Sequence, residues 1–161
     1  MTLAILLLEN NTMIKLFFDG SCEPVNPGGT AAWGYVIKDE NDKTLFSGSG
    51  IVGKGTGMTN NVAEYAGLIA GLTAVKKHNL MDSVNERLIV YGDSQMVINM
   101  VNKTWGWKKT RWIPHLKAPH LKDLLLHCLG ILQEWDGRYA LAWIPREENA
   151  EADELSKALS Y

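Results

Sequence analysis

The sequence predicts an α/β fold, a five-stranded mixed sheet flanked by helices on both faces. Three observations lead to it. β-prone segments come first in the chain, and segments with helical spacing alternate with strands after them. A short, wholly apolar strand, Leu88–Tyr91, is typical of a strand covered on both sides. The length of 161 residues suits one domain with a single core.

The first half of the chain predicts three strands. Met13–Asp19 is β-prone and ends in Asp-Gly, a turn signal. Ser21–Thr30 is rich in Gly, Pro and Asn and is predicted to be a loop. Ala32–Lys38 and Thr44–Val52 flank the polar turn 39–42, so they are expected to form a β-hairpin.

Helices and strands alternate in the second half. Asn60–His78 follows a Gly-rich connection and has Leu68, Leu72 and Val75 spaced for one buried face, which predicts a helix. The segment 103–117 carries Lys, Arg and Trp in quick succession and is assigned no regular element. The remaining predicted elements are a helix over Ser94–Val101, a helix over Leu121–Trp135, a strand over Arg138–Ile144 and a helix over Asn149–Leu159.

Composition and charge are those of an ordinary soluble protein, 46% hydrophobic with a net charge of -2. Such a charge neither demands nor excludes a nucleic-acid partner, because a local basic patch would decide that. Leu3–Leu8 is shorter than the roughly 20 residues of a membrane span. It also lacks the basic flank and cleavage site of a signal peptide. We therefore expect an N-terminal extension over 1–12, a domain over 13–161 and no membrane partner.

Two cysteines, Cys22 and Cys128, stand far apart in the chain. They are too few for a disulfide framework, and their spacing does not indicate zinc. Free thiols fit a reducing, cytoplasmic compartment.

Four acidic residues each have an ordinary structural explanation. Asp19 could serve only the Asp-Gly turn, and Glu64 could complete a capping box with Asn61. Asp93 precedes a predicted helix and could be its N-cap. Asp153 lies in a helix dense with Glu, where it could be a solvated surface residue.

The predicted fold gives these acids a second interpretation. Asp19 and Asp93 follow strands, at the edge where open α/β sheets build their sites. Glu64 shares the inward stripe of the first helix, where a carboxylate is costly without a cation or a donor. With Asp153 these residues make four acids, whose carboxylates would repel one another unless divalent cations bound them. Oxygen ligands favour Mg²⁺, with Mn²⁺ as a substitute, and two ions could hydrolyse a phosphodiester.

Five motifs in order resemble the type 1 ribonuclease H family, over about Met13 to Leu159. The motifs are Asp19-Gly-Ser-Cys, Asn26-Pro-Gly-Gly, Thr59-Asn-Asn-Val-Ala-Glu64-Tyr, Tyr91-Gly-Asp93-Ser-Gln and Asn149-Ala-Glu-Ala-Asp153-Glu-Leu. The resemblance implies the ribonuclease H fold and two-metal hydrolysis of the RNA strand of an RNA–DNA hybrid, leaving a 5′-phosphate and a 3′-hydroxyl. It also implies that the metal-binding carboxylates are Asp19, Glu64, Asp93 and Asp153.

The resemblance further implies a set of substrate contacts. The residues placed at the minor groove of the hybrid are Cys22, Asn26, Asn60, Asn61 and Gln95. Amide side chains suit that task because they can address 2′-hydroxyls, which distinguish RNA from DNA. Thr59 would bind a phosphate of the DNA strand, and Asn149 is also counted as a substrate contact. The alternative for these polar residues is turn and cap chemistry.

The segment Lys103–Trp112, hereafter the basic segment, resembles the protrusion with which the family grips the DNA strand, although it is shorter than in the long-handled members. Lys and Arg neutralise phosphates, and Trp offers a flat surface for sugars and bases. The alternative is that the tryptophans only pack over the sheet. The residues concerned are Trp105, Trp107, Lys108, Lys109, Arg111 and Trp112.

One departure from the family concerns a histidine that many relatives carry in the loop before the last helix. That loop is Pro145-Arg-Glu-Glu148 here. The histidines are expected to be surface or helix residues elsewhere: His78, His115, His120 and His127. We hypothesise that Arg146 or Glu147 takes over part of the missing role.

Two other functions remain open. One is a related carboxylate nuclease of the same fold, integrase-like or junction-resolving, and the other is a non-catalytic module that binds hybrids. The amide-rich start of the first helix favours the hybrid nuclease over the related carboxylate nuclease. A pure binder would gain nothing from four acids beside phosphates. We expect an RNA–DNA hybrid as partner, no obligate protein partner, and a monomer.

Overall fold

The computed structural model describes residues 12–104, 107–108, 111–112 and 120–157. Five strands form one mixed sheet in the order β3-β2-β1-β4-β7. β1, β2 and β3 pair antiparallel, whereas β1, β4 and β7 run parallel. The strands are β1 (Thr12–Glu23), β2 (Thr30–Lys38), β3 (Thr44–Lys54), β4 (Glu86–Gly92) and β7 (Tyr139–Trp143).

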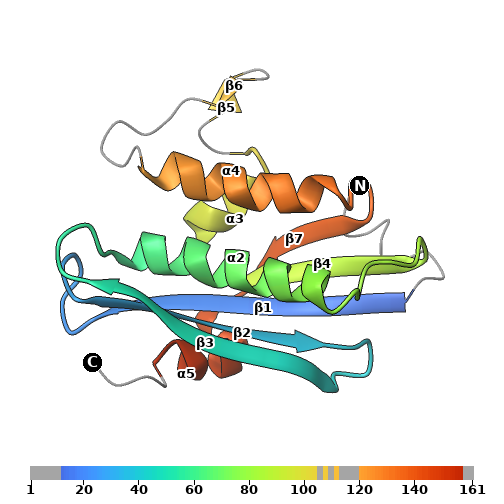
Figure 1. Cartoon of the computed structure of the whole chain (residues 1–161), viewed down its shortest axis with the longest axis horizontal. Coiled ribbons are helices and arrows are strands. Elements are labelled where there is room, and N and C mark those ends of the chain that lie inside the picture. Colours follow the sequence, from blue (N-terminus) through green and yellow to red (C-terminus); the bar gives the residue numbers. More distant parts are fainter. Residues whose placement is uncertain (1–11, 105–106, 109–110, 113–119, 158–161) are drawn as a thin grey trace.

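Helices cover both faces of this sheet, as predicted (Figure 1). α2, α3 and α4 lie on one face, and α5 lies on the other. Within the described residues, no helix has the length and apolar content needed to cross a bilayer. The helices are α2 (Asn60–Lys77), α3 (Gln95–Val101), α4 (His120–Gln133) and α5 (Ala150–Ser156), the last preceded by the 3-10 turn η1 (Arg146–Asn149).

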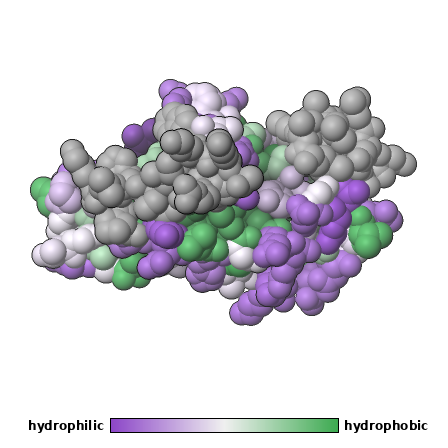
Figure 2. Space-filling model, turned by 90° about the horizontal axis from the view of Figure 1, so that it is seen from above, coloured by the Kyte–Doolittle hydropathy of each residue, from purple (hydrophilic) through white to green (hydrophobic). Residues whose placement is uncertain are grey.

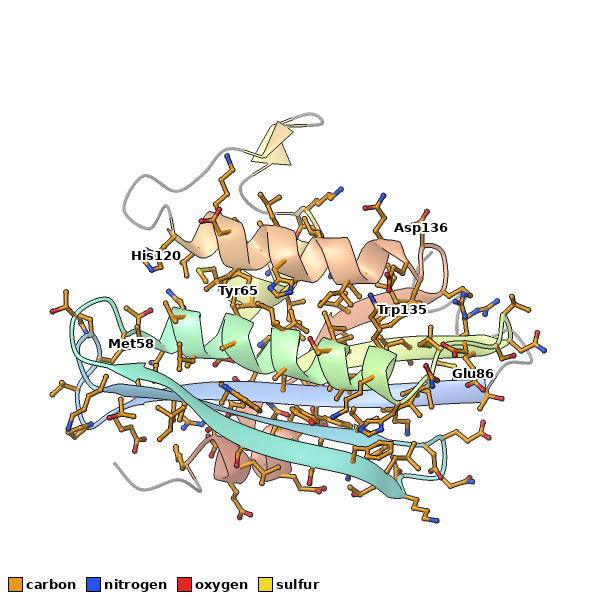
Figure 3. All side chains as sticks on the ribbon, in the orientation of Figure 1. Met58, Tyr65, Glu86, His120, Trp135 and Asp136 are labelled. Carbon is orange, nitrogen blue, oxygen red and sulfur yellow. The ribbon has the colours of Figure 1, made fainter. Side chains whose placement is uncertain are left out.

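The main core lies between the sheet and α2. The predicted stripe of Leu68, Leu72 and Val75 is fully buried and belongs to the same core cluster as Leu16 of β1. Each such side chain stabilises the fold by about 1.5–3 kcal/mol relative to exposure. Figure 3 shows Tyr65 in the space between α2 and α4, and its side chain is only 1% exposed. This core holds α2 in a fixed position against β1.

β1 differs from its prediction in an important way. The strand continues through Asp19 and Gly20 to Glu23 and pairs with β2 over that whole stretch. The predicted Asp-Gly turn is therefore wrong, and the loop predicted over 21–30 covers only 24–29. The physical reason is that a Cβ at Gly20 would lie 2.3 Å from the carbonyl carbon of Ala63 in α2. This glycine lets a helix pack directly on the strand rather than turning the chain.

Smaller differences concern the ends of elements. Thr12, predicted within the extension, is the first residue of β1 and pairs with Glu86 of β4. The rest of the predicted extension lies outside the described residues. Other boundaries differ by a few residues, as expected for frayed ends.

The basic segment forms a small two-stranded sheet of its own. β5 (Trp107–Lys108) pairs antiparallel with β6 (Arg111–Trp112). Figure 1 shows this pair beyond α4, on the side away from the main sheet. The backbone of Trp107 and Trp112 lies in this small sheet, and whether the tryptophan side chains pack over the main sheet stays open.

Figure 2 views the molecule from this side. Hydrophilic residues gather toward the right of the view, the end that holds the turn between β2 and β3 in Figure 1. That turn carries Asp39, Glu40, Asp42 and Lys43. The end where α2 begins is the opposite one.

Candidate active site

Parallel pairing brings two acids from distant parts of the chain side by side. β1 and β4 pair until Phe18 faces Gly92, so the next residues are Asp19, within β1, and Asp93, directly after the end of β4. Asp19 is 3% exposed because α2 covers this part of β1. The prediction that both acids follow strands holds for Asp93. Asp19 lies inside β1, at the point where its parallel pairing ends.

α2 places the third acid. The hydroxyl of Thr59 accepts a hydrogen bond from the Val62 backbone N–H (3.2 Å) and so caps the helix. Glu64 therefore completes no capping box with Asn61, and that alternative is wrong. Glu64 points inward, is 8% exposed, and its Oε2 has no hydrogen-bond partner.

Asp93 has no capping role either. The hydroxyl of Ser94 accepts from the Val97 N–H (3.2 Å) and caps α3. The Asp93 Oδ2 instead accepts a hydrogen bond of 3.1 Å from the side-chain amide of Asn149. Its carboxylate therefore remains directed at the other acids.

The acids meet in one place. Carboxylate oxygens of Asp19, Glu64 and Asp93 lie within 4.8 Å of one another. Asp153 of α5 is a near neighbour of Asp19 but stands outside that group of three. All four line one cavity of about 300 Å³, hereafter the acidic cavity.

The electrostatics of the cavity favour bound cations. Burial, followed by the charge of Asp93, raises the pKa of Asp19 to about 7. Burial, followed by the charge of Asp19, raises the pKa of Glu64 well above its usual value. Burial also raises the pKa of Asp93, against the hydrogen bond from Asn149 and the charge of Arg146. These carboxylates are therefore poorly stabilised as anions by the protein alone.

The donor set fits a hard divalent cation. Three carboxylates offer closely spaced oxygens, and the orphaned Oε2 of Glu64 has a free lone pair for a ligand bond. The thiol of Cys22 also lines the cavity, but it donates to the carbonyl oxygens of Val25 (3.3 Å) and Met58 (3.5 Å). The oxygen-rich set favours Mg²⁺ or Mn²⁺ over zinc.

Comparison with known proteins agrees with this geometry. The reverse transcriptase-like family model matches residues 17–159. A ribonuclease H of Pseudomonas fluorescens is 30% identical over 157 residues, covering 92% of this chain and 90% of its own length. One of Bartonella tribocorum is 28% identical over 162 residues, covering 94% and 91%. LC11-RNase H1, isolated from compost and solved in complex with an RNA/DNA hybrid, gives a TM-score of 0.74 at 32% identity, covering 91% of this chain and 99% of that one. The chain belongs to the type 1 ribonuclease H family.

In this ribonuclease H, two of the predicted minor-groove residues, Cys22 and Asn60, line the acidic cavity. Asn60 is exposed and lines it, and its backbone N–H donates to the Asn26 side-chain oxygen (3.1 Å). Asn61, the residue after Asn60 in the first turn of α2, is half-buried, and Gln95 is exposed at the start of α3. The turn-and-cap alternative describes part of this set, since Thr59 caps α2.

Asn149 is placed differently from its prediction. Its side chain is 1% exposed, so it does not face a substrate in this structure. Its amide nitrogen donates to the Phe18 carbonyl oxygen (2.9 Å) as well as to Asp93. Asn149 thereby links β1, the Asp93 carboxylate after β4 and the start of α5.

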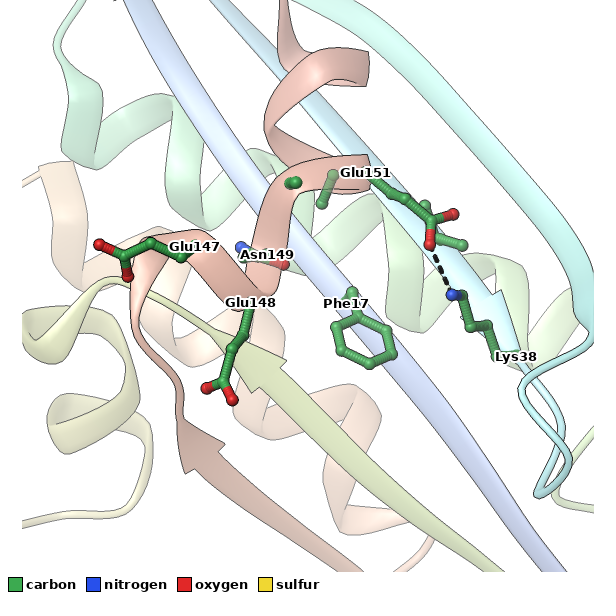
Figure 4. Close-up of a pocket in the computed structure, with 9 residues that line it drawn as sticks. Phe17, Lys38, Glu147, Glu148, Asn149 and Glu151 are labelled. Atoms are coloured by element: carbon green, nitrogen blue, oxygen red, sulfur yellow. Dashed lines mark hydrogen bonds and ion pairs between the residues drawn. The ribbon is translucent and has the colours of Figure 1, made fainter.

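The structure separates the two candidates for the missing histidine. Arg146 lines the acidic cavity, with its Nη2 3.5 Å from Asp153 Oδ1. Glu147 instead lines a second cavity of about 260 Å³, with Phe17 and Lys38, on the face of the sheet that α5 covers (Figure 4). The hypothesis for Glu147 is not supported by this placement, because its carboxylate points into a different part of the surface.

His78, His120 and His127 are exposed, as predicted, and His115 lies outside the described residues. Trp105 and Lys109 also lie outside them. Of Trp107, Lys108, Arg111 and Trp112 the structure gives the backbone, in the β5–β6 pair.

Two residues at the site escaped the sequence analysis. Lys157 lines the acidic cavity, with its Nζ 3.5 Å from Asp153 Oδ1. Its spacing of four residues from Asp153 on a predicted helix was a usable signal. Trp143 ends β7, is 46% exposed, and its indole N–H donates to the Asp93 carbonyl oxygen (3.1 Å). No sequence signal linked Trp143 to Asp93.

Proposed function

We propose that this protein hydrolyses the RNA strand of RNA–DNA hybrids in the acidic cavity. Two Mg²⁺ ions, for which Mn²⁺ can substitute, would take part with substrate bound, leaving a 5′-phosphate and a 3′-hydroxyl. The observation that carries the proposal is the close grouping of the Asp19, Glu64 and Asp93 oxygens. The complex of LC11-RNase H1 with an RNA/DNA hybrid supports the substrate class.

The chain's own residues have distinct tasks in this reaction. Asp19, Glu64, Asp93 and Asp153 would hold the cations, which lower the pKa of bound water and stabilise charge on the phosphate. Because the Asp19 pKa is about 7 without a cation, cation binding releases protons. Asn149 holds the Asp93 carboxylate in a fixed orientation through its 3.1 Å hydrogen bond.

Exposed amides at the cavity mouth would select the hybrid. Asn60 and Asn26 lie together beside the acids, where a side-chain amide can donate to a 2′-hydroxyl or accept from it. The basic β5–β6 pair would neutralise phosphates of the DNA strand. The protein would thus recognise the 2′-hydroxyls of the RNA strand at the acidic cavity and hold the DNA strand at the β5–β6 pair.

One assay tests the proposal directly. A labelled RNA–DNA hybrid, a DNA duplex and an RNA duplex are each incubated with and without Mg²⁺, with Asp93→Asn as the inactive control. We expect cleavage of the RNA in the hybrid alone, none with chelator, and products that a 5′-phosphate-dependent exonuclease degrades. Comparable cutting of the DNA duplex would instead identify the related carboxylate nuclease. Tight hybrid binding without cleavage in Mg²⁺ or Mn²⁺ would identify the binding module.

Arg146 is the better candidate for the missing histidine's role. Its guanidinium lies at the acidic cavity, so Arg146→Ala should lower single-turnover cleavage about tenfold by removing charge beside the phosphate. Glu147→Ala removes a charge from the neighbouring residue but not from the cavity, and should leave the rate unchanged. Equal rates for both variants and the wild type would remove Arg146 from the mechanism.

We also propose that one protomer suffices and acts in the cytoplasm. All four acids that line the cavity come from the same chain, so the site needs no second copy. Light scattering should give a monomer mass near 17.9 kDa. A stable dimer would contradict this part.

A further inference from the structure

The fourth carboxylate is held differently from the other three. Asp153 Oδ1 lies 3.5 Å from Arg146 Nη2 and 3.5 Å from Lys157 Nζ, so two cationic side chains share one oxygen. Its side chain is 24% exposed, whereas Asp19 and Glu64 are almost fully buried. Within the described part of the chain, no Lys or Arg forms an ion pair with the three acids of the tight group, although the charge of Arg146 also acts on Asp93.

The backbone fixes the positions of these two cationic side chains. Arg146 begins η1, and Lys157 follows α5 one helical turn after Asp153. Lys157 Nζ is also 3.8 Å from Glu23 Oε1, at the end of β1. Arg146 and Lys157 both line the acidic cavity itself. They are thus built into the wall that a metal ion would face.

Charge then makes the cavity unequal for an incoming metal ion. At the tight group of three, a divalent cation meets closely spaced oxygens, one of them without a partner. At Asp153 it meets two positive charges about 3.5 Å from the ligand oxygen. Like charges repel at such short distances, so a divalent cation and the two cationic side chains compete for Asp153.

We propose that Arg146 and Lys157 form a charge clamp on Asp153 that withholds this carboxylate from cation binding in the substrate-free enzyme. A first divalent cation binds to Asp19, Glu64 and Asp93, and Asp153 becomes a ligand only after its ion pairs open. A substrate phosphate opens them because it offers both cations another anionic partner. The clamp rests on the proposed metal site, and it adds an order of cation binding coupled to the substrate.

The test measures Mn²⁺ binding to the metal-free full-length chain by electron paramagnetic resonance of unbound Mn²⁺, without nucleic acid. Asp153→Asn and Asp93→Asn are each made in the wild type and in the clamp-free variant Arg146→Met, Lys157→Met. In the wild type, Asp153→Asn should weaken binding less than about threefold and Asp93→Asn more than about 30-fold. In the clamp-free variant, Asp153→Asn should weaken binding about tenfold, since Asp153 is then available as a ligand.

Two matched variants serve as controls. Lys76→Met removes one positive charge and a surface ion pair with Glu134 (2.8 Å) away from the cavity, and it should leave the effect of Asp153→Asn unchanged. The pair Arg146→Lys, Lys157→Arg keeps both charges and should behave as the wild type does. Thermal unfolding measurements test whether each variant is folded. We expect all of them to fold, because the side chains of Arg146, Lys157 and Asp153 are partly exposed.

The outcomes separate the clamp from the proposed function. An equal cost of Asp153→Asn in the wild type and in the clamp-free variant overturns the clamp while leaving the metal site intact. The same coupling in Lys76→Met also overturns it, because a general charge effect would then explain the result. No Mn²⁺ binding to the wild type removes the proposed metal site itself, and the clamp with it.

Discussion

At the scale of single residues, Asp19 shows that the folded protein holds carboxylates close enough to repel one another. Its carboxyl group is buried beside Glu64 and Asp93, which raises its pKa to about 7. Removing that charge should relieve repulsion in the metal-free protein while removing a metal ligand.

We therefore expect opposite effects of Asp19→Asn on stability and activity. At pH 8 without metal, the free energy of unfolding should rise by about 1–3 kcal/mol, and hybrid cleavage should fall by about 1000-fold or more. Urea unfolding and single-turnover cleavage measure the two. Asp42→Asn is the matched control. It removes an exposed carboxylate paired with Lys15 (2.8 Å), so it should neither stabilise the protein nor slow cleavage. A destabilised Asp19→Asn protein would refute the electrostatic account.

The burial of Asn149 and its hydrogen bond to Asp93 predict that it acts through Asp93 rather than on the substrate. In Asn149→Ala, the Phe18 carbonyl and the Asp93 carboxylate both lose their donor. We expect kcat to fall about 10- to 100-fold with little change in KM, and stability to fall by about 1–3 kcal/mol. Asn102→Ala removes a comparable amide hydrogen bond to the Leu141 carbonyl (3.1 Å) outside the cavity, so it should lower stability alone. A KM effect in Asn149→Ala would point to direct substrate contact.

At the scale of elements, the contact between β1 and α2 positions Glu64 next to Asp19. A Cβ at Gly20 would lie 2.3 Å from the Glu64 backbone nitrogen, and one at Gly67 would lie 2.6 Å from the Asp19 carbonyl oxygen. Backbone atoms cannot move aside as a flexible side chain can. Any side chain at these positions therefore separates the helix from the strand.

Gly20→Ala and Gly67→Ala should each destabilise the protein by about 1–3 kcal/mol or more. Both should weaken Mn²⁺ binding, because Glu64 moves away from Asp19. Gly130→Ala is the matched control in α4, where a new Cβ meets nothing within 4 Å. It should stabilise the helix by about 0.5–1 kcal/mol and leave Mn²⁺ binding unchanged. Wild-type metal affinity in both packed-glycine variants would contradict the positioning role of this contact.

At the scale of the whole molecule, the acidic cavity links stability, pH and metal. The folded-state pKa values of Asp19 and Glu64 are raised, so the folded protein holds more protons than the unfolded chain between about pH 4 and pH 7. The contribution of these two carboxylates to stability therefore falls as pH rises through this window. Asp19 alone corresponds to a change on the order of 4 kcal/mol at most, from 3.8 to about 7.

We expect the metal-free protein to unfold at lower urea concentration at pH 8 than at pH 5. Mg²⁺ should remove most of that difference, since it binds the ionised carboxylates and stabilises the folded state by mass action. Urea titrations at pH 5, 6, 7 and 8, with and without Mg²⁺, measure both effects. Asp19→Asn should flatten the pH dependence. Greater stability at pH 8 than at pH 5 without metal would contradict the assignment of raised pKa values.

Local patterns in the chain were sufficient to predict the elements and the chemistry of the site. Hydrophobic spacing gave the buried stripe of α2, and the alternation of elements gave a mixed sheet with helices on both faces. The four acids were found because their carboxylates follow or face the strands in the predicted fold. These features follow from local periodicity and from chain order, which a sequence contains directly.

The way in which these elements meet depends on tertiary packing. Asp-Gly reads locally as a turn, yet at Asp19–Gly20 the packing of α2 and pairing with β2 keep the strand extended. The orientation of the last helix puts Asn149 behind Asp93 and Lys157 beside Asp153, while Glu147 is among the residues that line another cavity. Distances between side chains far apart in the sequence depend on how helix and sheet pack, and packing is a property of the whole chain rather than of any segment.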